Sequence, residues 1–104
     1  MKTHFSYRNT DENCKKILEN YVTEEKLQGL SRLLQHGNMD LADLDIRLEY
    51  LSHHNNFSAK INLKIGKRVF FSEDSSRNLT EVFDLALEKI ISQLRKLESV
   101  RHNT

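Results

Sequence analysis

The basic side chains give the clearest chemical signal in this sequence. Lys89 and Lys96 are seven residues apart in the last segment with helical apolar spacing, so they share a helix face, and Arg95 lies further round. Lysine and arginine bind phosphate groups without reading a base sequence. A second set of cations, in or just before the first such segment, comprises Arg8, Lys15, Lys16, Lys26 and Arg32. If the two helices pack side by side, the two sets form one phosphate-binding surface.

The same charges also fit a simpler interpretation, in which they only keep the surface soluble. Glu81, Glu88 and Glu98 are interspersed among the cations of the last segment. The chain has 16 lysines and arginines against 15 aspartates and glutamates, which gives a formal net charge of +1. A balanced total still allows one basic face and one acidic face. Spacing alone leaves both interpretations open.

Three other groups of residues could in principle hold a metal or catalyse a reaction. His53 and His54 are adjacent, so in an extended segment they point in opposite directions, and we interpret them as part of a solvated hairpin loop. Cys14 lies on an apolar stripe, where a thiol acts as a small hydrophobic group. The acidic run at residues 72–76 lacks the ligand spacing of a calcium loop and is expected just before a helix.

Motifs of known enzyme classes are also missing from the sequence. It contains no Ser-His-Asp signature, no phosphate-binding glycine loop and no dinucleotide fingerprint. We therefore predict a protein that is not an enzyme, with no catalytic residue, no metal site, no cofactor and no small-molecule substrate.

Length and composition predict one cytoplasmic domain over residues 1–104. A chain of 104 residues can close one hydrophobic core but not two. No stretch approaches the roughly 20 apolar residues of a membrane-spanning helix, and the first residues contain no apolar run of signal-peptide length. The single cysteine cannot form an internal disulfide.

The first half of the chain predicts a strand followed by a helix. Residues 3–8 alternate between apolar and polar, as a half-buried strand does. Thr10 or Asp11 can cap a helix whose apolar spacing is regular to Val22. The spacing then slips by about one residue, which predicts an irregular turn or a kink near residues 24–29. Gly37 is expected to end this helix.

The second half predicts three strands and a last helix. Residues 44–50, 57–65 and 68–72 form a meander, with a hairpin at Gly66-Lys67. Ser76 or Asn78 begins a helix that ends near Ser99, and Asn78 with Glu81 resembles a capping box. The order β-α-β-β-β-α predicts an α+β fold in which two helices cover one face of a four-stranded sheet and the other face is open to solvent.

The segment FFSEDSSRNLTEVFDLALEKIISQLRK, residues 70–96, resembles a pattern of the ribosome hibernation-promoting factor and ribosome-associated inhibitor A family. That pattern has an acidic-serine segment, then Asp-Met-Tyr, Ala-Ile-Asp, Lys-Leu and Gln-Leu-x-Lys, and it aligns here without a gap. The positions that keep or nearly keep it are Phe83-Asp84, Ala86, Lys89-Ile90 and Gln93-Leu94 with Lys96. The likeness extends over essentially the whole chain, and the predicted element order is also that of the family.

The resemblance implies a short-form translation inhibitor that acts in stress or stationary phase. Family members resemble double-stranded-RNA-binding domains in topology and sit in the small-subunit channel where mRNA and tRNA bind. Basic residues of both helices contact rRNA there. Carried over by position, the best matches are Lys89 and Lys96, and a looser alignment adds Lys15, Lys16, Lys26 and Arg32. The partner is therefore expected to be the small ribosomal subunit, without a membrane contact.

The chain also departs from the family pattern. Ser92 and Glu98 occupy positions that are usually basic, and Thr80 replaces the usual tyrosine. Two lost charges weaken phosphate binding, and Arg95 compensates in part. The alternatives are therefore a protein-interaction module that has lost rRNA binding and a generic RNA-binding domain. The chain ends after the last helix, so it is expected to lack the dimerisation domain of long-form members. It is also expected to be monomeric when free, because the exposed sheet face carries few large apolar residues.

Overall fold

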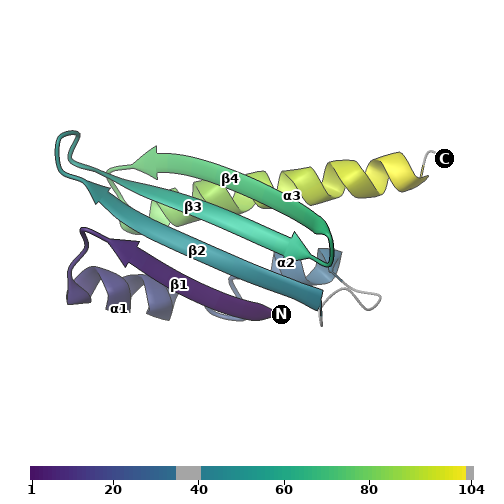
Figure 1. The fold of residues 1–104 in the computed structure, drawn as a ribbon, viewed down its shortest axis with the longest axis horizontal. Helices are drawn as coiled ribbons and strands as arrows, with labels where there is room; N and C mark the ends of the chain where they lie inside the picture. Colours follow the sequence, from purple (N-terminus) through teal and green to yellow (C-terminus); the bar gives the residue numbers. More distant parts are fainter. Residues whose placement is uncertain (35–40, 103–104) are drawn as a thin grey trace.

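The structure is a computed structural model that describes the backbone of residues 1–34 and 41–102 and the side chains of residues 1–34 and 41–97. Figure 1 shows the path of the chain from one element to the next. The elements are β1 (Lys2–Arg8), α1 (Glu12–Tyr21), α2 (Gln28–Leu33), β2 (Ala42–Leu51), β3 (Asn56–Ile65), β4 (Arg68–Ser76) and α3 (Leu79–His102).

The four strands form one mixed sheet in the order β1-β2-β3-β4. β1 and β2 run parallel, whereas β3 is antiparallel to both β2 and β4. A parallel pair needs a long crossover between its strands, and the segment containing α1 and α2 supplies it. The predicted α+β class and the four-stranded sheet are confirmed.

The first predicted helix is two helices, so the described residues contain three helices rather than two. α1 ends at Tyr21 and α2 begins at Gln28. Leu18 and Leu30 are both fully buried, although twelve residues of continuous helix would turn them about a third of a circle apart. The break at residues 22–27, which overlaps the predicted irregularity near residues 24–29, lets both face the core. The predicted role of Gly37 lies outside the described residues.

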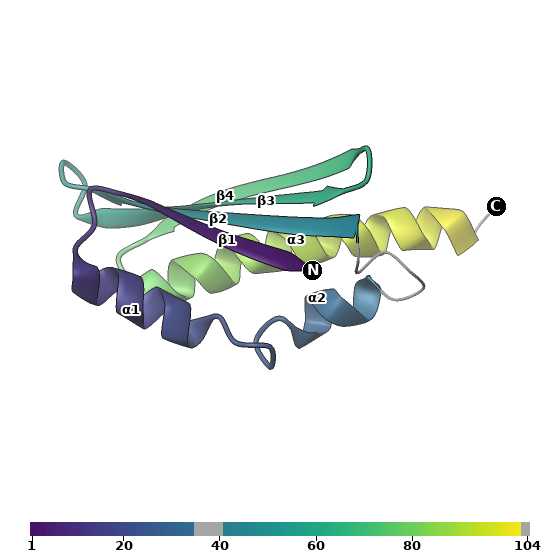
Figure 2. The same ribbon diagram turned by 60° about the horizontal axis from the view of Figure 1, so that its bottom comes forward.

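All three helices cover one face of the sheet, and the other face is open (Figure 2). On the covered face, Leu44 and Leu48 of β2 and Ile61 of β3 are fully buried. α3 contributes Phe83 and Ile90, which are also fully buried. The alternation of residues along β2 and β3 therefore buries one set against the helices and leaves the other toward solvent, as the period of two predicts.

β4 continues to Ser76, so the prediction that it ends at Ser72 is wrong. Glu73 and Asp74 are strand residues paired with β3, and they do not form a loop before the last helix. The buried hydroxyl of Ser72 donates to the carbonyl of Ala86 at 2.7 Å and so ties β4 to α3. Contacts with α3, which sequence spacing does not reveal, extend the strand.

Asp11 caps α1 as predicted. Its carboxylate accepts a hydrogen bond from the backbone N–H of Cys14 at 2.8 Å. This bond lowers the pKa of Asp11, because a donor stabilises the charged form. At the far end of the chain, α3 extends to His102, slightly beyond the predicted end near Ser99.

Tyr7 places a polar atom in the layer between β1 and α1. Its hydroxyl is buried and has no hydrogen-bond partner among the described residues. Burial, and then the charge of nearby Glu19, raises the pKa of Tyr7 to about 12. Glu19 acts through its charge, because no hydrogen bond of good geometry joins the two side chains. The native state therefore holds this proton more tightly than the unfolded chain, whose tyrosine pKa is about 10.

Replacing Tyr7 with phenylalanine is expected to flatten the alkaline loss of stability. Stability due to a raised pKa is complete below the unfolded value of about 10 and is lost as pH rises toward about 12. The phenylalanine variant lacks this pH-dependent contribution. At neutral pH its free energy of unfolding is expected to match that of the wild type or exceed it by up to about 1 kcal/mol, because an unpaired hydroxyl has been removed. Urea denaturation at pH about 8, 10 and 11 measures both effects. The same decline in both proteins would contradict the prediction.

Candidate nucleic-acid interface

Seven of the eight cations predicted to bind phosphate lie in the helix layer, which we define as residues 11–34 and 79–97. Lys15 and Lys16 are on α1, Lys26 and Arg32 are in the segment that ends with α2, and the other three are on α3. Arg8 is different. It ends β1 on the open face of the sheet, where its Nε lies 3.8 Å from Oε2 of Glu49 on the neighbouring strand. The structure therefore does not bring Arg8 to the helices, contrary to expectation.

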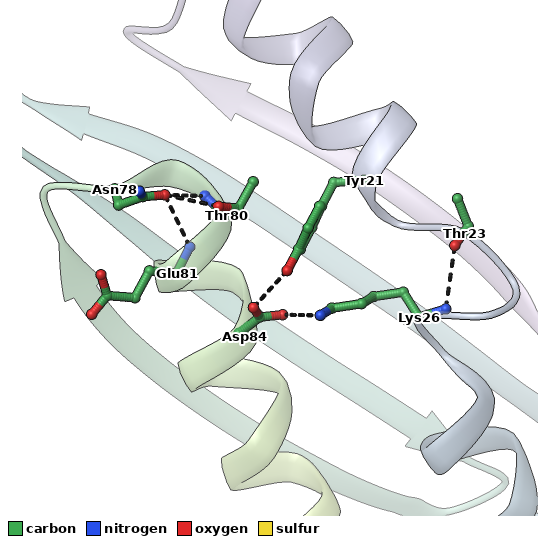
Figure 3. Close-up of polar contacts among 7 residues, drawn as sticks. All are labelled: Tyr21, Thr23, Lys26, Asn78, Thr80, Glu81 and Asp84. Atoms are coloured by element: carbon green, nitrogen blue, oxygen red, sulfur yellow. Dashed lines mark hydrogen bonds and ion pairs between the residues drawn. The ribbon is translucent and has the colours of Figure 1, made fainter.

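Lys26 is tied to α3 rather than directed to solvent. Its Nζ lies 3.0 Å from Oδ1 of Asp84, and it sits over the ring of Tyr21 at 4.6 Å from the centroid. Tyr21 completes the cluster by donating its hydroxyl to Oδ2 of Asp84 at 2.6 Å, as Figure 3 shows. Tyr21 and then Asp84 hold the pKa of Lys26 above its ordinary value. These three side chains join α1 and the α1–α2 connection to α3.

Asn78 fixes the start of α3 beside this cluster (Figure 3). Its side-chain oxygen accepts hydrogen bonds from the backbone N–H groups of Thr80 at 3.0 Å and Glu81 at 3.2 Å. It also accepts from the Thr80 hydroxyl at 2.8 Å. The predicted N-cap is therefore confirmed, whereas the backbone N–H of Asn78 donates to Ser76 and not to Glu81, so only one half of the capping box forms.

Lys89 also contacts another element of the fold, although its side chain is 53% exposed. Its Nζ lies 3.1 Å from Oδ2 of Asp74 and donates to the carbonyl of Glu73 at 2.9 Å. One turn further along α3, Gln93 donates to the carbonyl of Phe71 at 2.7 Å. The Ser75 backbone N–H and then Lys89 hold the pKa of Asp74 below its usual range. Lys89 thus links α3 to β4, and its charge is largely neutralised where the resemblance had assigned it to rRNA.

Lys15 is the fourth of the eight cations with an internal partner. Its Nζ lies 3.2 Å from Oε1 of Glu12 and 5.4 Å from the centroid of the Tyr7 ring. A lysine in this position covers an aromatic side chain with its apolar stem. It is therefore part of the packing between α1 and β1.

The remaining four cations, Lys16, Arg32, Arg95 and Lys96, are exposed. None forms an ion pair with a carboxylate whose side chain the structure describes. α2 and α3 run in the same direction (Figure 2), and they meet where a Cβ on Gly29 would lie 3.6 Å from Cδ1 of Ile91. Arg32 and Arg95 each follow this contact by about one helical turn. They therefore lie at the same level of the helix layer.

The helix layer as a whole has no excess positive charge. Residues 11–34 contain five carboxylates and four cations, and residues 79–97 contain three of each. Binding of phosphate to this layer must therefore depend on where the exposed cations lie rather than on net charge. Arg32 and Arg95 lie at one level of the layer, whereas Lys96 lines the groove between α3 and β4.

The cluster of Tyr21, Lys26 and Asp84 was not foreseen. In the sequence Asp84 only keeps the family pattern, and the available signal is a polar residue within an apolar helix stripe. The two partners of Asp84 are remote in sequence, Tyr21 being 63 residues away. No spacing rule connects positions so far apart.

The other candidate sites behave as ordinary surface and core groups. His53 and His54 are exposed in the turn between β2 and β3. Burial raises the pKa of the Cys14 thiol, which makes it a weaker nucleophile. In the part of the chain that the structure describes, no three His, Cys, Asp or Glu side chains gather closely enough to hold a metal ion. No helix there is both long and apolar enough to span a membrane.

Comparison with known proteins agrees with this fold. The N-terminal domain of Thermus thermophilus Protein Y shares 18% identity with a TM-score of 0.73, and the match covers 93% of this chain and 99% of that one. A ribosomal subunit interface protein from Coxiella burnetii shares 15% identity with a TM-score of 0.64, covering 92% and 98%. No curated protein sequence matches the chain.

Structural likeness at this level of identity shows the fold but not the family. A family profile shows the family. The profile described as sigma 54 modulation protein / S30EA ribosomal protein matches residues 4–101. This match covers nearly all of the chain and agrees with the pattern at residues 70–96. The chain therefore belongs to the sigma 54 modulation protein / S30EA ribosomal protein family, which is the hibernation-promoting factor family that its C-terminal segment resembles.

Proposed function

We propose that this protein associates with the small ribosomal subunit and inhibits translation by occupying the channel for mRNA and tRNA. The family match over residues 4–101 is the observation that supports this proposal most directly. One of the structural neighbours bears the description of a ribosomal subunit interface protein. The action requires binding and no catalytic step. It places the protein in the cytoplasm, as a single domain over residues 1–104 that is monomeric when free and acts under stress or in stationary phase.

The contact surface that the geometry favours is formed by α2 and the C-terminal half of α3. Arg32, Arg95 and Lys96 are exposed there without a described carboxylate partner. Lys26 and Lys89 lie in the same layer but are engaged by Asp84 and Asp74. An engaged cation must give up an internal partner before it can neutralise a phosphate, so the unpaired cations make the stronger contribution.

Sedimentation of the purified protein with ribosomes through a sucrose gradient tests the proposal. The protein is expected to migrate with small subunits or whole ribosomes at both low and near-physiological salt. The double variant Arg95→Glu/Lys96→Glu is expected to lower the affinity by about ten- to a hundredfold, because two charged contacts are lost. The slope of log affinity against log salt should fall by about 1 for each phosphate contact removed.

The control is a charge reversal of equal size away from the helix layer. Lys2 is exposed on the open face of β1, so Lys2→Glu matches the charge change of Arg95→Glu alone. Lys89→Glu is a poor control and a poor test, because it places a carboxylate against Asp74 and disturbs the contact of α3 with β4. Equal losses in Lys2→Glu and Arg95→Glu would mean that binding senses net charge and not the α2–α3 surface.

A second function, a protein-interaction module with the same fold, is favoured by one observation. The helix layer has eight carboxylates and seven cations over residues 11–34 and 79–97. Affinity for ribosomes that disappears at near-physiological salt would support this second function, since weak electrostatic binding is screened there.

A further inference from the structure

The local excess of positive charge lies on the sheet and not on the helices. Residues 56–76 contain four cations, Lys60, Lys64, Lys67 and Arg68, and two carboxylates, Glu73 and Asp74. None of the four cations forms an ion pair with a carboxylate among the described side chains. This part of the chain is the β3–β4 hairpin, which forms one edge of the sheet. A hairpin with more cations than carboxylates therefore lies outside the helix layer.

The open face of this hairpin combines cations with exposed apolar groups. We define the β3–β4 patch as Lys60, Asn62 and Lys64 of β3 with Val69 and Phe71 of β4. Strand alternation turns these residues away from the helices, since their neighbours Ile61 and Leu63 are fully buried in the core. Val69 is 58% exposed and Phe71 is 51% exposed. About half of the Phe71 side chain is therefore accessible to a ligand that approaches from solvent.

The register places Phe71 at the centre of the patch. Asn62 is directly opposite Phe71, and Lys64 is opposite Val69. Lys60 and Lys64 are the diagonal neighbours of Phe71 on β3, at a separation that long side chains span. An aromatic ring thus has an amide beside it and a flexible cation on either side along the strand direction.

The nearby carboxylates leave these cations available. Glu73 is opposite Lys60, and Asp43 of β2 is opposite Lys64. Asp45 of β2 is opposite Asn62 and so diagonal to both lysines. None of the three carboxylates forms an ion pair with Lys60 or Lys64. Asp74 points to the covered face and is paired with Lys89. Lys60 and Lys64 are therefore free to neutralise groups that approach from solvent.

We propose that the β3–β4 patch binds single-stranded RNA, with one base stacked on Phe71 and the adjoining phosphates contacted by Lys60 and Lys64. Proteins that bind single strands without sequence preference combine aromatic platforms with cations that follow the backbone. Asn62 offers both a donor and an acceptor to the edge of the stacked base. The binding is expected to tolerate many sequences, because every base has a face that can stack.

A second copy of the chain fits the patch less well. Two copies meeting at this face would bring Lys60 and Lys64 toward the same residues of the partner copy, and like charges in contact are unfavourable. Pairing through the edge of β4 is also hindered, because Lys89 and Gln93 of α3 already occupy the carbonyls of Glu73 and Phe71. Charge complementarity favours a polyanion.

This inference does not depend on the ribosome proposal. The patch lies on the side of the sheet opposite the helices, as Figure 2 shows for the two layers. A naked oligonucleotide tests it without ribosomes, so a failure of one proposal leaves the other open to its own test.

Fluorescence anisotropy with a labelled, unstructured RNA of about 12 nucleotides tests the proposal on the full chain. Phe71→Ala is expected to weaken binding by about 5- to 150-fold, which corresponds to the loss of one stacked base. Phe71→Leu keeps an apolar side chain but has no aromatic face, so it is expected to lose a similar factor. Lys60→Glu/Lys64→Glu should reduce the slope of log affinity against log salt by about 1.4, for two single-strand contacts.

The controls separate this surface from the helix layer. Lys2→Glu reverses one exposed charge on β1, outside both surfaces, and should change oligonucleotide binding little. In the helix-layer variant Arg95→Glu/Lys96→Glu, Phe71→Ala should still cause the same fold-loss of binding. Circular dichroism confirms that each variant is folded. Binding that Phe71→Leu retains in full would overturn the stacking proposal. Three further outcomes would also overturn the proposal. The wild type would not bind the oligonucleotide, or only the helix-layer variant would lose binding, or the protein would self-associate in a way that Phe71→Ala abolishes.

Discussion

Replacing Asp84 with alanine is expected to lower the free energy of unfolding by about 2 kcal/mol. Asp84 accepts from the Tyr21 hydroxyl at 2.6 Å and pairs with Lys26 at 3.0 Å. Its removal leaves a partly buried hydroxyl and a cation without their acceptor, which is unfavourable by about 1–3 kcal/mol. The side chains of Lys26 and Asp84 are 35% and 38% exposed, so solvent screens the ion pair and most of the loss comes from the tyrosine. Urea denaturation measures the change.

A double-mutant cycle isolates the Tyr21–Asp84 contact. Tyr21→Phe removes the hydroxyl and keeps the ring, which packs edge-on against Phe83 with centroids 6.1 Å apart. If the hydrogen bond is the source of the loss, Asp84→Ala should be less damaging in the Tyr21→Phe background by about 0.5–1.5 kcal/mol. Additive effects of the two substitutions would show that Asp84 does not join the helices through this contact.

The same cluster connects stability with the proposed binding surface. Tyr21 and Lys26 precede α2, and Asp84 precedes Arg95 on α3 by about three turns. Fixing the α1–α2 connection to α3 therefore also fixes Arg32 relative to Arg95. A side chain outside the proposed contact surface thus positions two side chains that belong to it.

The fold was largely predictable from the sequence because its strands keep a strict period of two. Leu44, Ile46 and Leu48 alternate with charged residues, and this pattern alone places them in the core. The caps were equally readable, since Asp11 and Asn78 act locally on the next few backbone N–H groups. The predictions failed where distant contacts decide the structure. β4 extends past Ser72 because α3 holds it, and α1 separates from α2 because each fills a different part of the core.

The candidate interface was less predictable for the same reason. Helical spacing placed Lys89 and Lys96 on one face, and both do line the groove between α3 and β4. Spacing cannot show that Asp74, fifteen residues before Lys89, folds back to pair with it. The sequence shows which side chains are cations. Whether a cation is available to a binding partner depends on its neighbours in the folded structure.

Replacing Phe83 with alanine is expected to lower the free energy of unfolding by about 3–5 kcal/mol, the largest effect of any substitution considered for this chain. Phe83 is fully buried, and it contacts Tyr21 as well as the sheet-facing core. The loss combines the transfer of the ring to water with the cavity left behind, to which the edge-on aromatic contact adds about 0.5–1.5 kcal/mol. Urea denaturation measures the change through the shift of the midpoint.

Phe83→Ile provides the matched comparison, because isoleucine is the residue that the family pattern has at this position. An alanine variant loses a large share of the roughly 5–15 kcal/mol that stabilises a chain of this size, whereas isoleucine refills most of the cavity. We expect Phe83→Ile to lose less than half as much as Phe83→Ala, with an unchanged slope against urea. A loss below about 1.5 kcal/mol in the alanine variant would mean that the core relaxes around the missing ring. In that case α3 would be held to the sheet mainly by its polar contacts at Ser72, Lys89 and Gln93.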